Sequence, residues 1–317
     1  MFLSNCSTET INVAAKSLAA GNLVAFPTET VYGLGADATN SAAVAKIYKA
    51  KGRPADHPLI VHISSIDAIG EWAADIPEYA INLARDFWPG PMTLVFNRSA
   101  LAKDFITGSQ NTIGLRVPNQ PIALALLKEF EKLGGKGIAA PSANRFGAVS
   151  PTTSQAVIEE LADYLDAEKD LILDGGQCVV GVESTIIDCT SDRPQILRLG
   201  AITKEMVQES TGLLVIDDVA SDIRVSGSLE SHYSPEAKVV LDQLATTGEG
   251  FIALDSISTP AGAIRLAAPI SVESYAREIY SALRFADAQG ISRICVMQPE
   301  GDGLAAAIRD RLKRAAN

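Results

Sequence analysis

The sequence is poor in cysteine and lacks long apolar runs. Four cysteines, Cys6, Cys178, Cys189 and Cys295, occur in 317 residues without Cys-x-x-Cys spacing, so neither a disulfide framework nor a zinc site is expected. No segment approaches the roughly eighteen uninterrupted apolar residues of a membrane span, and the N-terminus lacks a basic start followed by an apolar stretch. We therefore expect a soluble, cytoplasmic protein with reduced thiols and no membrane contact.

Several nucleotide-binding and catalytic signatures are also missing. The sequence contains no G-x-x-x-x-G-K-[ST], no G-x-G-x-x-G and no G-x-S-x-G, which argues against a P-loop ATPase, a dinucleotide enzyme and a serine hydrolase with a nucleophile elbow. Positive charge is scarce, with 27 Lys and Arg against 38 Asp and Glu and a net charge of −11. An acidic chain without an Arg-rich tract is a poor nonspecific ligand for nucleic acid.

What is present is a strand, turn, helix and strand unit over residues 23–63. An apolar run ends at Pro27 and indicates a buried strand, and residues 28–35 are expected to form a turn with hydroxyls at Thr28 and Thr30. Gly33 and Gly35 are expected where the backbone has a positive φ or comes close to a ligand. The carboxyl end of a strand in an open α/β sheet is a common ligand site.

Two cations follow the helix predicted over residues 41–50. Lys51 and Arg53 flank Gly52 and precede Pro54, so we expect both to lie just past the helix, in a loop beside the glycine turn. Cations in such a loop favour phosphate. The unit as a whole indicates a nucleotide site.

These residues resemble the L-threonylcarbamoyladenylate synthases, the YrdC-like proteins of tRNA modification. The matching stretches are PTETVYGLG, KGR, PLIVHI, FWPGPMTLVF, LRVP, PSAN, GVESTIID and LRLG, in this order over residues 27–200. The continuation through SHYSP at 231–235 is similar to the long, two-domain form. The resemblance implies that ATP, L-threonine and bicarbonate become threonylcarbamoyl-AMP and pyrophosphate, with magnesium bound through the ATP phosphates. It also implies that the product passes to the tRNA threonylcarbamoyl transferase machinery, with at most weak tRNA contact.

The resemblance also implies roles for individual residues. Lys51 and Arg53 would be the catalytic cations, and no chain residue would bind metal. Threonine would contact Thr30, His62, Arg116, Ala140 and Ser184. ATP would contact Arg53, His57, Thr112, Ser142, Asn144, Ser150, Arg198 and Tyr233.

Alternating apolar runs and helix-period segments predict an α/β fold, a YrdC-like twisted mixed sheet covered by helices. Strands are expected near residues 23–27, 59–63, 93–96, 112–117, 137–140, 171–173, 185–188 and 195–198, and helices near 9–20, 41–50, 77–87, 120–132, 153–165 and 203–210. We expect the catalytic domain over residues 1–212, a polar linker over 213–236, and a smaller Rossmann-like α/β domain over 237–317.

Alternatives remain from the residues alone. Ser142 and Asn144 could shape a turn, and Thr112 could be an ordinary strand residue. His57 and His62 could suggest a metal pair, but their odd spacing puts them on opposite faces of a strand. If Tyr233 contacts ATP, the linker must fold back over the first domain as a lid. The rival functions are an RNA-binding or ribosome-maturation factor and another ATP-dependent acyl or carbamoyl transferase of the same fold.

Overall fold

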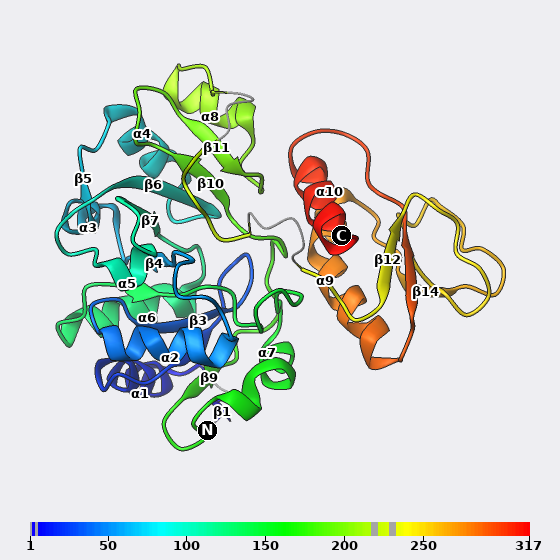
Figure 1. The fold of residues 1–317 in the computed structure, drawn as a ribbon, viewed down its shortest axis with the longest axis horizontal. Helices are drawn as coiled ribbons and strands as arrows, with labels where there is room; N and C mark the ends of the chain where they lie inside the picture. The colour runs from blue at the N-terminus through cyan, green and yellow to red at the C-terminus, as the bar shows by residue number, and fades with distance from the viewer. Residues whose placement is uncertain (1, 4–5, 217–220, 228–232) are drawn as a thin grey trace.

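The computed structural model describes residues 2–3, 6–216, 221–227 and 233–317. Figure 1 shows a larger body that contains the N-terminal two thirds of the chain and a smaller body built from the C-terminal part. No helix in these described ranges has the length and apolar character of a membrane span.

The larger body is organised around one eleven-stranded sheet. Ten strands follow the order β1-β9-β2-β3-β8-β4-β7-β6-β10-β11, and β5 pairs with β6 at the side. Their bounds are β1 Phe2–Leu3, β2 Val24–Phe26, β3 Gly33–Asp37, β4 Ile60–His62, β5 Ala73–Ala74, β6 Met92–Arg98, β7 Thr112–Arg116, β8 Ile138–Ala139, β9 Leu171–Leu173, β10 Thr185–Asp188 and β11 Gln195–Arg198. Parallel pairs such as β4 with β7 coexist with antiparallel pairs such as β6 with β7. The predicted mixed sheet is therefore confirmed.

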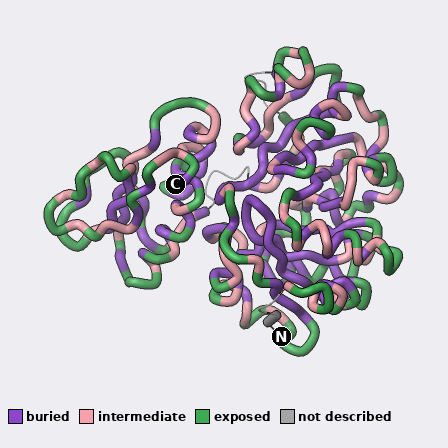
Figure 2. Tube along the Cα trace, turned by 180° about the vertical axis from the view of Figure 1, so that it is seen from behind, coloured by how far each residue is buried: buried purple, intermediate pink, exposed green. Residues whose placement is uncertain are grey.

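Helices cover this sheet, and several begin where the sequence predicts. Their bounds are α1 Thr8–Ala19, α2 Ser41–Lys51, α3 Ile69–Trp72, α4 Glu78–Phe87, α5 Asp104–Thr107, α6 Pro121–Lys132, α7 Ser154–Leu161 and α8 Lys204–Thr211, with short 3-10 turns at Ile66–Ala68 and Ala162–Tyr164. Asn40 caps α2, because its side-chain oxygen accepts hydrogen bonds from two backbone N–H groups of the first turn. Gly52 ends α2 in the left-handed region, with φ 62°. Figure 2 shows buried residues gathered in the interior and exposed residues along the outer turns of the chain.

The segment expected to be a turn over residues 28–35 is partly a strand. Gly33 and Gly35 belong to β3, which pairs antiparallel with β2 through Phe26↔Gly33 and Val24↔Gly35. Neither glycine has a positive φ, which leaves the other expectation, a backbone close to a ligand, and Gly33 does line the pocket described below. Gly35 is needed for close packing instead, since a Cβ there would lie 2.8 Å from side-chain atoms of Phe26 and Ile138.

The smaller body is the expected small α/β domain. Its sheet is parallel throughout, in the order β12-β15-β13-β14, with β12 Lys238–Leu241, β13 Gly250–Ile252, β14 Ile264–Ala267 and β15 Arg293–Val296. Helices α9 Val272–Ala288 and α10 Leu304–Ala315 lie on the side of this sheet that faces the larger body (Figure 1). Loop residues such as Ala245 and Ile257 pack with Phe251 and Cys295 in a separate apolar cluster.

The described part of the linker packs against the larger body. Val225 shares an apolar cluster with Val95 and Ile186. The Arg224 guanidinium donates to the Gly108 carbonyl oxygen at 2.7 Å, and the Arg224 N–H donates to Gln110. The chain therefore folds back over the sheet between the two bodies, as the lid hypothesis requires.

Candidate active site

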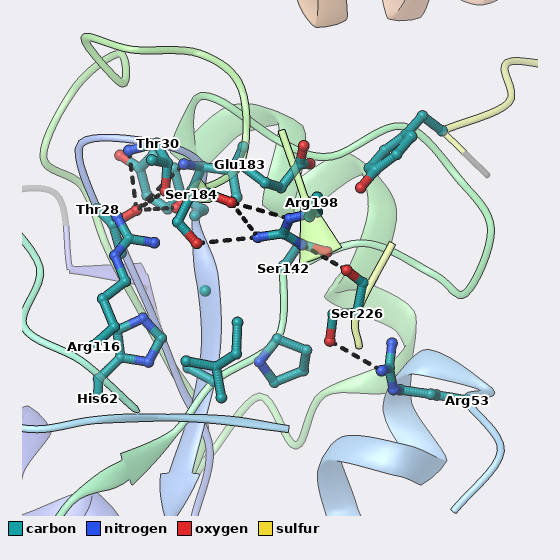
Figure 3. Close-up of a pocket in the computed structure, with 17 residues that line it drawn as sticks. Thr28, Thr30, Arg53, His62, Arg116, Ser142, Glu183, Ser184, Arg198 and Ser226 are labelled. Atoms are coloured by element: carbon teal, nitrogen blue, oxygen red, sulfur yellow. Dashed lines mark hydrogen bonds between the residues drawn. The ribbon is translucent and has the colours of Figure 1, made fainter. Parts of the chain in front are cut away.

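A polar pocket opens above the ends of several sheet strands, as shown in Figure 3. It encloses about 540 Å³, part of which is open to solvent. Nine of the residues predicted to bind substrate line it: Thr30, Arg53, His62, Arg116, Ala140, Ser142, Ser184, Arg198 and Tyr233. All five positions that the resemblance assigns to threonine are thus brought together.

Hydroxyl groups follow the end of β2. The Thr28 hydroxyl donates to the Val31 carbonyl oxygen at 2.7 Å and lies 2.8 Å from the Thr30 hydroxyl. Thr30 must then donate to Thr28, because Thr28 has only one hydroxyl proton. The remaining lone pairs of Thr30 are available as acceptors at the pocket wall.

Arg116 and His62 come from neighbouring parallel strands, where the register places them side by side. The Arg116 guanidinium forms a buried ion pair with Glu29 at 2.7 Å, and its Nε donates to the Gly90 carbonyl oxygen at 3.3 Å. The sequence indicates that an inward arginine needs a partner, but Glu29 in the PTET stretch was not identified as that partner.

His62 is an uncharged imidazole in this pocket. Burial, and next the nearby Arg116 guanidinium, lower the pKa of His62 to about 3. Its Nδ1 is buried and has no hydrogen-bond partner among the described residues. The ring packs edge-on against Phe26, with centroids 5.9 Å apart. A polar substrate group could therefore pair with the free ring nitrogen.

Two further cations, Arg53 and Arg198, lie on the opposite wall of the pocket. Arg198 donates through Nε and Nη2 to the Ser184 carbonyl oxygen at 3.0 and 2.9 Å, and through Nη1 to the Ser226 carbonyl oxygen at 2.7 Å. Arg53 donates through Nη2 to the Pro58 carbonyl oxygen and to the Ser226 hydroxyl at 3.0 and 3.2 Å, and its buried Nε has no partner among the described residues. Burial lowers the pKa of Arg53 to about 10, so the side chain stays charged at neutral pH.

Glu183 is the carboxylate of this wall, and the sequence did not single it out. Its Oε1 accepts from the Ser150 hydroxyl at 2.7 Å, and its Oε2 accepts from Tyr280 and Arg311 at 2.9 and 2.8 Å. Burial alone would raise the pKa of Glu183, but the Arg311 and Arg198 charges and hydrogen bonds from Arg311 and Ser150 lower it to about 2. Glu183 is therefore ionised, and both of its oxygens already have donors.

The linker supplies two lining residues, Ser226 and Tyr233. Tyr233 was expected near ATP, whereas Ser226 was not identified. Tyr233 is buried, has φ 62°, and stacks on Tyr280 of α9 with ring centroids 5.7 Å apart. Residues 231 and 232 of the predicted SHYSP match lie outside the described residues.

Lys51 does not lie in a loop past the helix, and that expectation is wrong. It is the last residue of α2 and is 1% exposed. Its ammonium donates to the carbonyl oxygens of Ser142, at 2.6 Å, and of Asn144. Burial, and next the charge of Arg53, hold the pKa of Lys51 well below its usual value. Lys51 thus positions the 142–144 loop and does not line the pocket.

Four other residues assigned to ATP lie outside the pocket wall. Ser150 is bonded to Glu183, and the Asn144 amide donates to Arg145 and Ala148 carbonyl oxygens. His57 packs edge-on against Phe146, with ring centroids 5.2 Å apart. Thr112 lines a neighbouring hollow of about 320 Å³, together with Ile186, Val225 and other residues of the sheet and the linker. This hollow shares Ile60 and Ser226 with the main pocket.

The described residues contain no group of three or more His, Cys, Asp or Glu side chains placed to hold a metal ion. The carboxylate that lines the pocket, Glu183, already accepts from three donors. The donor set therefore fits a magnesium ion only as part of a phosphate complex, in which phosphate and water oxygens are its ligands.

Comparisons with known proteins identify the family of this chain. A family model described as telomere recombination, covering Sua5, YciO and YrdC, matches residues 16–200, and one described as the C-terminal domain of threonylcarbamoyl-AMP synthase matches residues 202–317. The threonylcarbamoyl-AMP synthases of Pyrococcus abyssi and Bacillus subtilis are 38% and 37% identical, each over 96% of this chain and over 94% and 92% of their own lengths. The crystal structure of P. abyssi Sua5 complexed with L-threonine aligns with a TM-score of 0.89 at 36% identity, covering 100% of this chain and 97% of that one. The chain therefore belongs to the Sua5 family of threonylcarbamoyl-AMP synthases, in its two-domain form.

Proposed function

We propose that this protein converts ATP, L-threonine and bicarbonate to threonylcarbamoyl-AMP and pyrophosphate, the first step of threonylcarbamoyladenosine modification of tRNA. The observation that carries the proposal is one pocket with Arg116, Thr30 and His62 on one wall and Arg53 and Arg198 on the other. The related P. abyssi protein has been solved with L-threonine. The alternative RNA-binding or ribosome-maturation role has no support from these comparisons.

On the first wall, Arg116 would hold the threonine carboxylate. Its guanidinium can form two parallel hydrogen bonds with a carboxylate. The Thr30 and Ser184 hydroxyls would accept hydrogen bonds from the ammonium and accept from or donate to the threonine hydroxyl. The uncharged His62 would add a polar contact without repelling the ammonium. Ala140 leaves room beside them, because it is a small residue of the lining.

On the second wall, Arg53 and Arg198 would neutralise the triphosphate. Both guanidiniums are buried, and the hydrogen bonds that they donate to described residues end on carbonyl or hydroxyl oxygens. Ser142 offers a further hydroxyl at the same wall. Magnesium would enter with ATP and supply additional positive charge to the phosphate oxygens.

The adenosine would occupy the neighbouring hollow that contains Thr112. This hollow has apolar walls from Ile186 and Val225 and polar groups from Thr112 and Gln110. An apolar slot with a few hydrogen-bonding groups suits a nucleobase. Because Ile60 and Ser226 line both the hollow and the main pocket, the two are neighbours, and we propose that one nucleotide spans both.

The chemistry needs no nucleophile from the protein. Bicarbonate takes up a proton and gives carbon dioxide and water, and the threonine ammonium loses a proton to solvent. The resulting amine adds to carbon dioxide and loses a second proton, which gives a carbamate. A carbamate oxygen then attacks the α-phosphorus of ATP, the bond from that phosphorus to the oxygen bridging to the β-phosphate breaks, and pyrophosphate leaves. Holding the two reactants in line can contribute roughly 7 to 11 kcal/mol toward the barrier.

The linker would act as a lid over the reacting groups. Ser226 and Tyr233 lie at the pocket wall, and Val225 covers the hollow proposed for adenosine. Excluding water would protect the mixed anhydride from hydrolysis. We propose that the product is made in the cytoplasm and passed to the tRNA threonylcarbamoyl transferase machinery.

The test is incubation of the purified protein with ATP, magnesium, labelled bicarbonate and each amino acid in turn. We expect threonine to release pyrophosphate and to yield an adenylate that carries the label. Pyrophosphate release that does not depend on threonine, or an adenylate without label, would contradict the proposal.

A further inference from the structure

Glu183 of the pocket is held by side chains from the other body. Arg311 of α10 donates to its Oε2 at 2.8 Å, and Tyr280 of α9 donates to the same oxygen at 2.9 Å. Arg311 is 1% exposed and Glu183 is 6% exposed. Arg311 and Glu183 are 128 residues apart in the sequence, so the contact exists only when the two bodies are docked.

The same guanidinium also fixes the strand that carries Arg198. Arg311 Nη2 donates to the Leu199 carbonyl oxygen at 2.8 Å, and Leu199 directly follows Arg198. Glu183 directly precedes Ser184, whose carbonyl and hydroxyl oxygens accept hydrogen bonds from Arg198. Arg311 therefore donates hydrogen bonds to the residue before Ser184 and to the residue after Arg198.

A third contact reaches the linker. The Arg311 guanidinium lies over the Tyr233 ring, 5.4 Å from its centroid, and Tyr233 also stacks on Tyr280. Arg311 thus contacts Glu183, Leu199 and Tyr233 in three different directions. The planar guanidinium has five N–H donors in a fixed fork, whereas a lysine ammonium cannot reproduce this set.

We propose that Arg311 is a positioning residue for the nucleotide wall of the pocket: by holding Glu183, Leu199 and Tyr233, it sets the place and direction of the Arg198 guanidinium. The C-terminal body therefore completes the active site. Arg311 does not touch the substrate in this scheme, since it lies behind Glu183 and is not a lining residue. The proposal rests on the proposed function for the identity of the ligand, ATP.

A purely structural role would give a different result. If Arg311 only docks the two bodies, its replacement would lower stability and the fraction of active protein, with the affinity for each substrate unchanged. A positioning role predicts a selective effect, because Arg198 faces the proposed phosphates while Arg116 and Glu29 lie on the threonine wall and have no contact with Arg311 among the described residues.

The experiment compares three variants of the full chain. Arg311→Lys keeps the charge but loses the fork, Tyr280→Phe removes one hydroxyl from Glu183, and Lys313→Met changes an exposed cation of the same helix. ATP and threonine affinities are measured by calorimetry, their KM values by pyrophosphate release, and folding by circular dichroism and thermal melting.

We expect Arg311→Lys to weaken ATP binding about 10-fold or more, as loss of hydrogen bonds to charged groups does. Tyr280→Phe should weaken ATP binding by roughly 3-fold to 10-fold. In both variants the threonine affinity should fall less than the ATP affinity, because among the proposed threonine contacts Ser184 bonds to Arg198 whereas Arg116 does not, and Lys313→Met should match the wild type. If Arg311→Lys does not fold, the isosteric Tyr280→Phe variant decides.

Equal losses for ATP and threonine, or unchanged affinities at a lower active fraction, would overturn the positioning role. A wild type that binds ATP but makes no threonylcarbamoyl-AMP would contradict the proposed function alone, and the ATP affinities would still test Arg311. A wild type that does not bind ATP would overturn both.

Discussion

The two walls of the pocket are assembled differently. The wall with Thr30, His62 and Arg116 comes from strands of the larger body and the segments that follow them. The wall with Arg53 and Arg198 is completed by Ser226 of the linker and is supported from behind by Arg311 of the C-terminal body. The first wall therefore draws its residues from the larger body alone, whereas the second also depends on the linker and the C-terminal body.

The two walls also differ in how their positive charges are balanced. Arg116 has its own buried counter-charge in Glu29, at 2.7 Å. Arg53 and Arg198 donate to uncharged oxygens among the described residues. An acidic protein can thus keep a local surplus of positive charge where a polyanion is to bind, because nearby charges dominate in a buried site.

Replacing Arg53 should have the largest effect. We expect Arg53→Ala to lower threonine-dependent pyrophosphate release about 100-fold to 1000-fold, because a preorganised donor to developing charge is lost. The circular dichroism spectrum should persist. Lys49→Ala, an exposed cation of the preceding helix α2, is the control and should keep the wild-type rate. A wild-type rate for Arg53→Ala would remove this cation from the proposed mechanism.

Removing the linker and the C-terminal body should weaken binding at the nucleotide wall and leave binding at the threonine wall intact. A chain that ends after Ile216 keeps the bridge from Ile216 to Gln195 in the larger body. We expect it to bind threonine but to retain nucleotide roughly 10-fold to 100-fold less well, since Ser226, Tyr233 and Arg311 are gone. Equilibrium binding and the rate of intermediate loss measure this difference. Unchanged kinetics would rule out the lid.

Thr112→Val should have a smaller effect that is confined to the nucleotide. The change removes a hydroxyl from the hollow proposed for adenosine while keeping the shape of the side chain. We expect the KM for ATP to rise roughly 2-fold to 10-fold, as for one lost neutral hydrogen bond. The KM for threonine should not move. If both values rose together, Thr112 would matter only for the sheet.

The smallest effect on activity should come from titration of His62. Its pKa is lowered to about 3, so the imidazole stays neutral between pH 5 and 8 and should contribute no step to the activity profile there. Its effect on stability has a definite sign. The His62 imidazole takes up a proton below about pH 6.5 in the unfolded chain but not in the folded one. The free energy of unfolding therefore falls by about 2 kcal/mol as the pH drops from 6.5 to 5. Denaturation of the wild type and of His62→Gln at both pH values measures this loss, which should be larger in the wild type, because His57, whose pKa is also lowered by burial, contributes in both proteins.

Much of the first body could be predicted from the sequence, because its strands are apolar runs and its helices have recognisable ends. The segments 171–173, 185–188 and 195–198 are strands as expected. The strand at Gly33–Asp37 was missed because its glycines are typical of turns, and only the packing of Phe26 and Ile138 explains them. The short helices at Ile69–Trp72 and Asp104–Thr107 are too brief to give a periodic signal.

The candidate site was predictable only in part, for a related reason. The five positions that the motif match assigns to threonine lie at one pocket. It did not indicate Ser226 or Glu183, whose partners Arg53 and Arg311 lie 173 and 128 residues away in the sequence. No pattern of neighbouring residues can indicate a contact between residues so far apart in the sequence. The same limit explains Lys51, whose burial depends on carbonyl groups 91 and 93 residues further along the chain.

Because the fold keeps the Lys51 amine out of water, chemical labelling of this amine can report unfolding. Reagents that acylate free amines should modify surface lysines of the native protein and spare Lys51 until the chain unfolds. Peptide mass mapping after brief labelling along a urea series would then use this residue as an internal reporter of unfolding at the wall of the pocket.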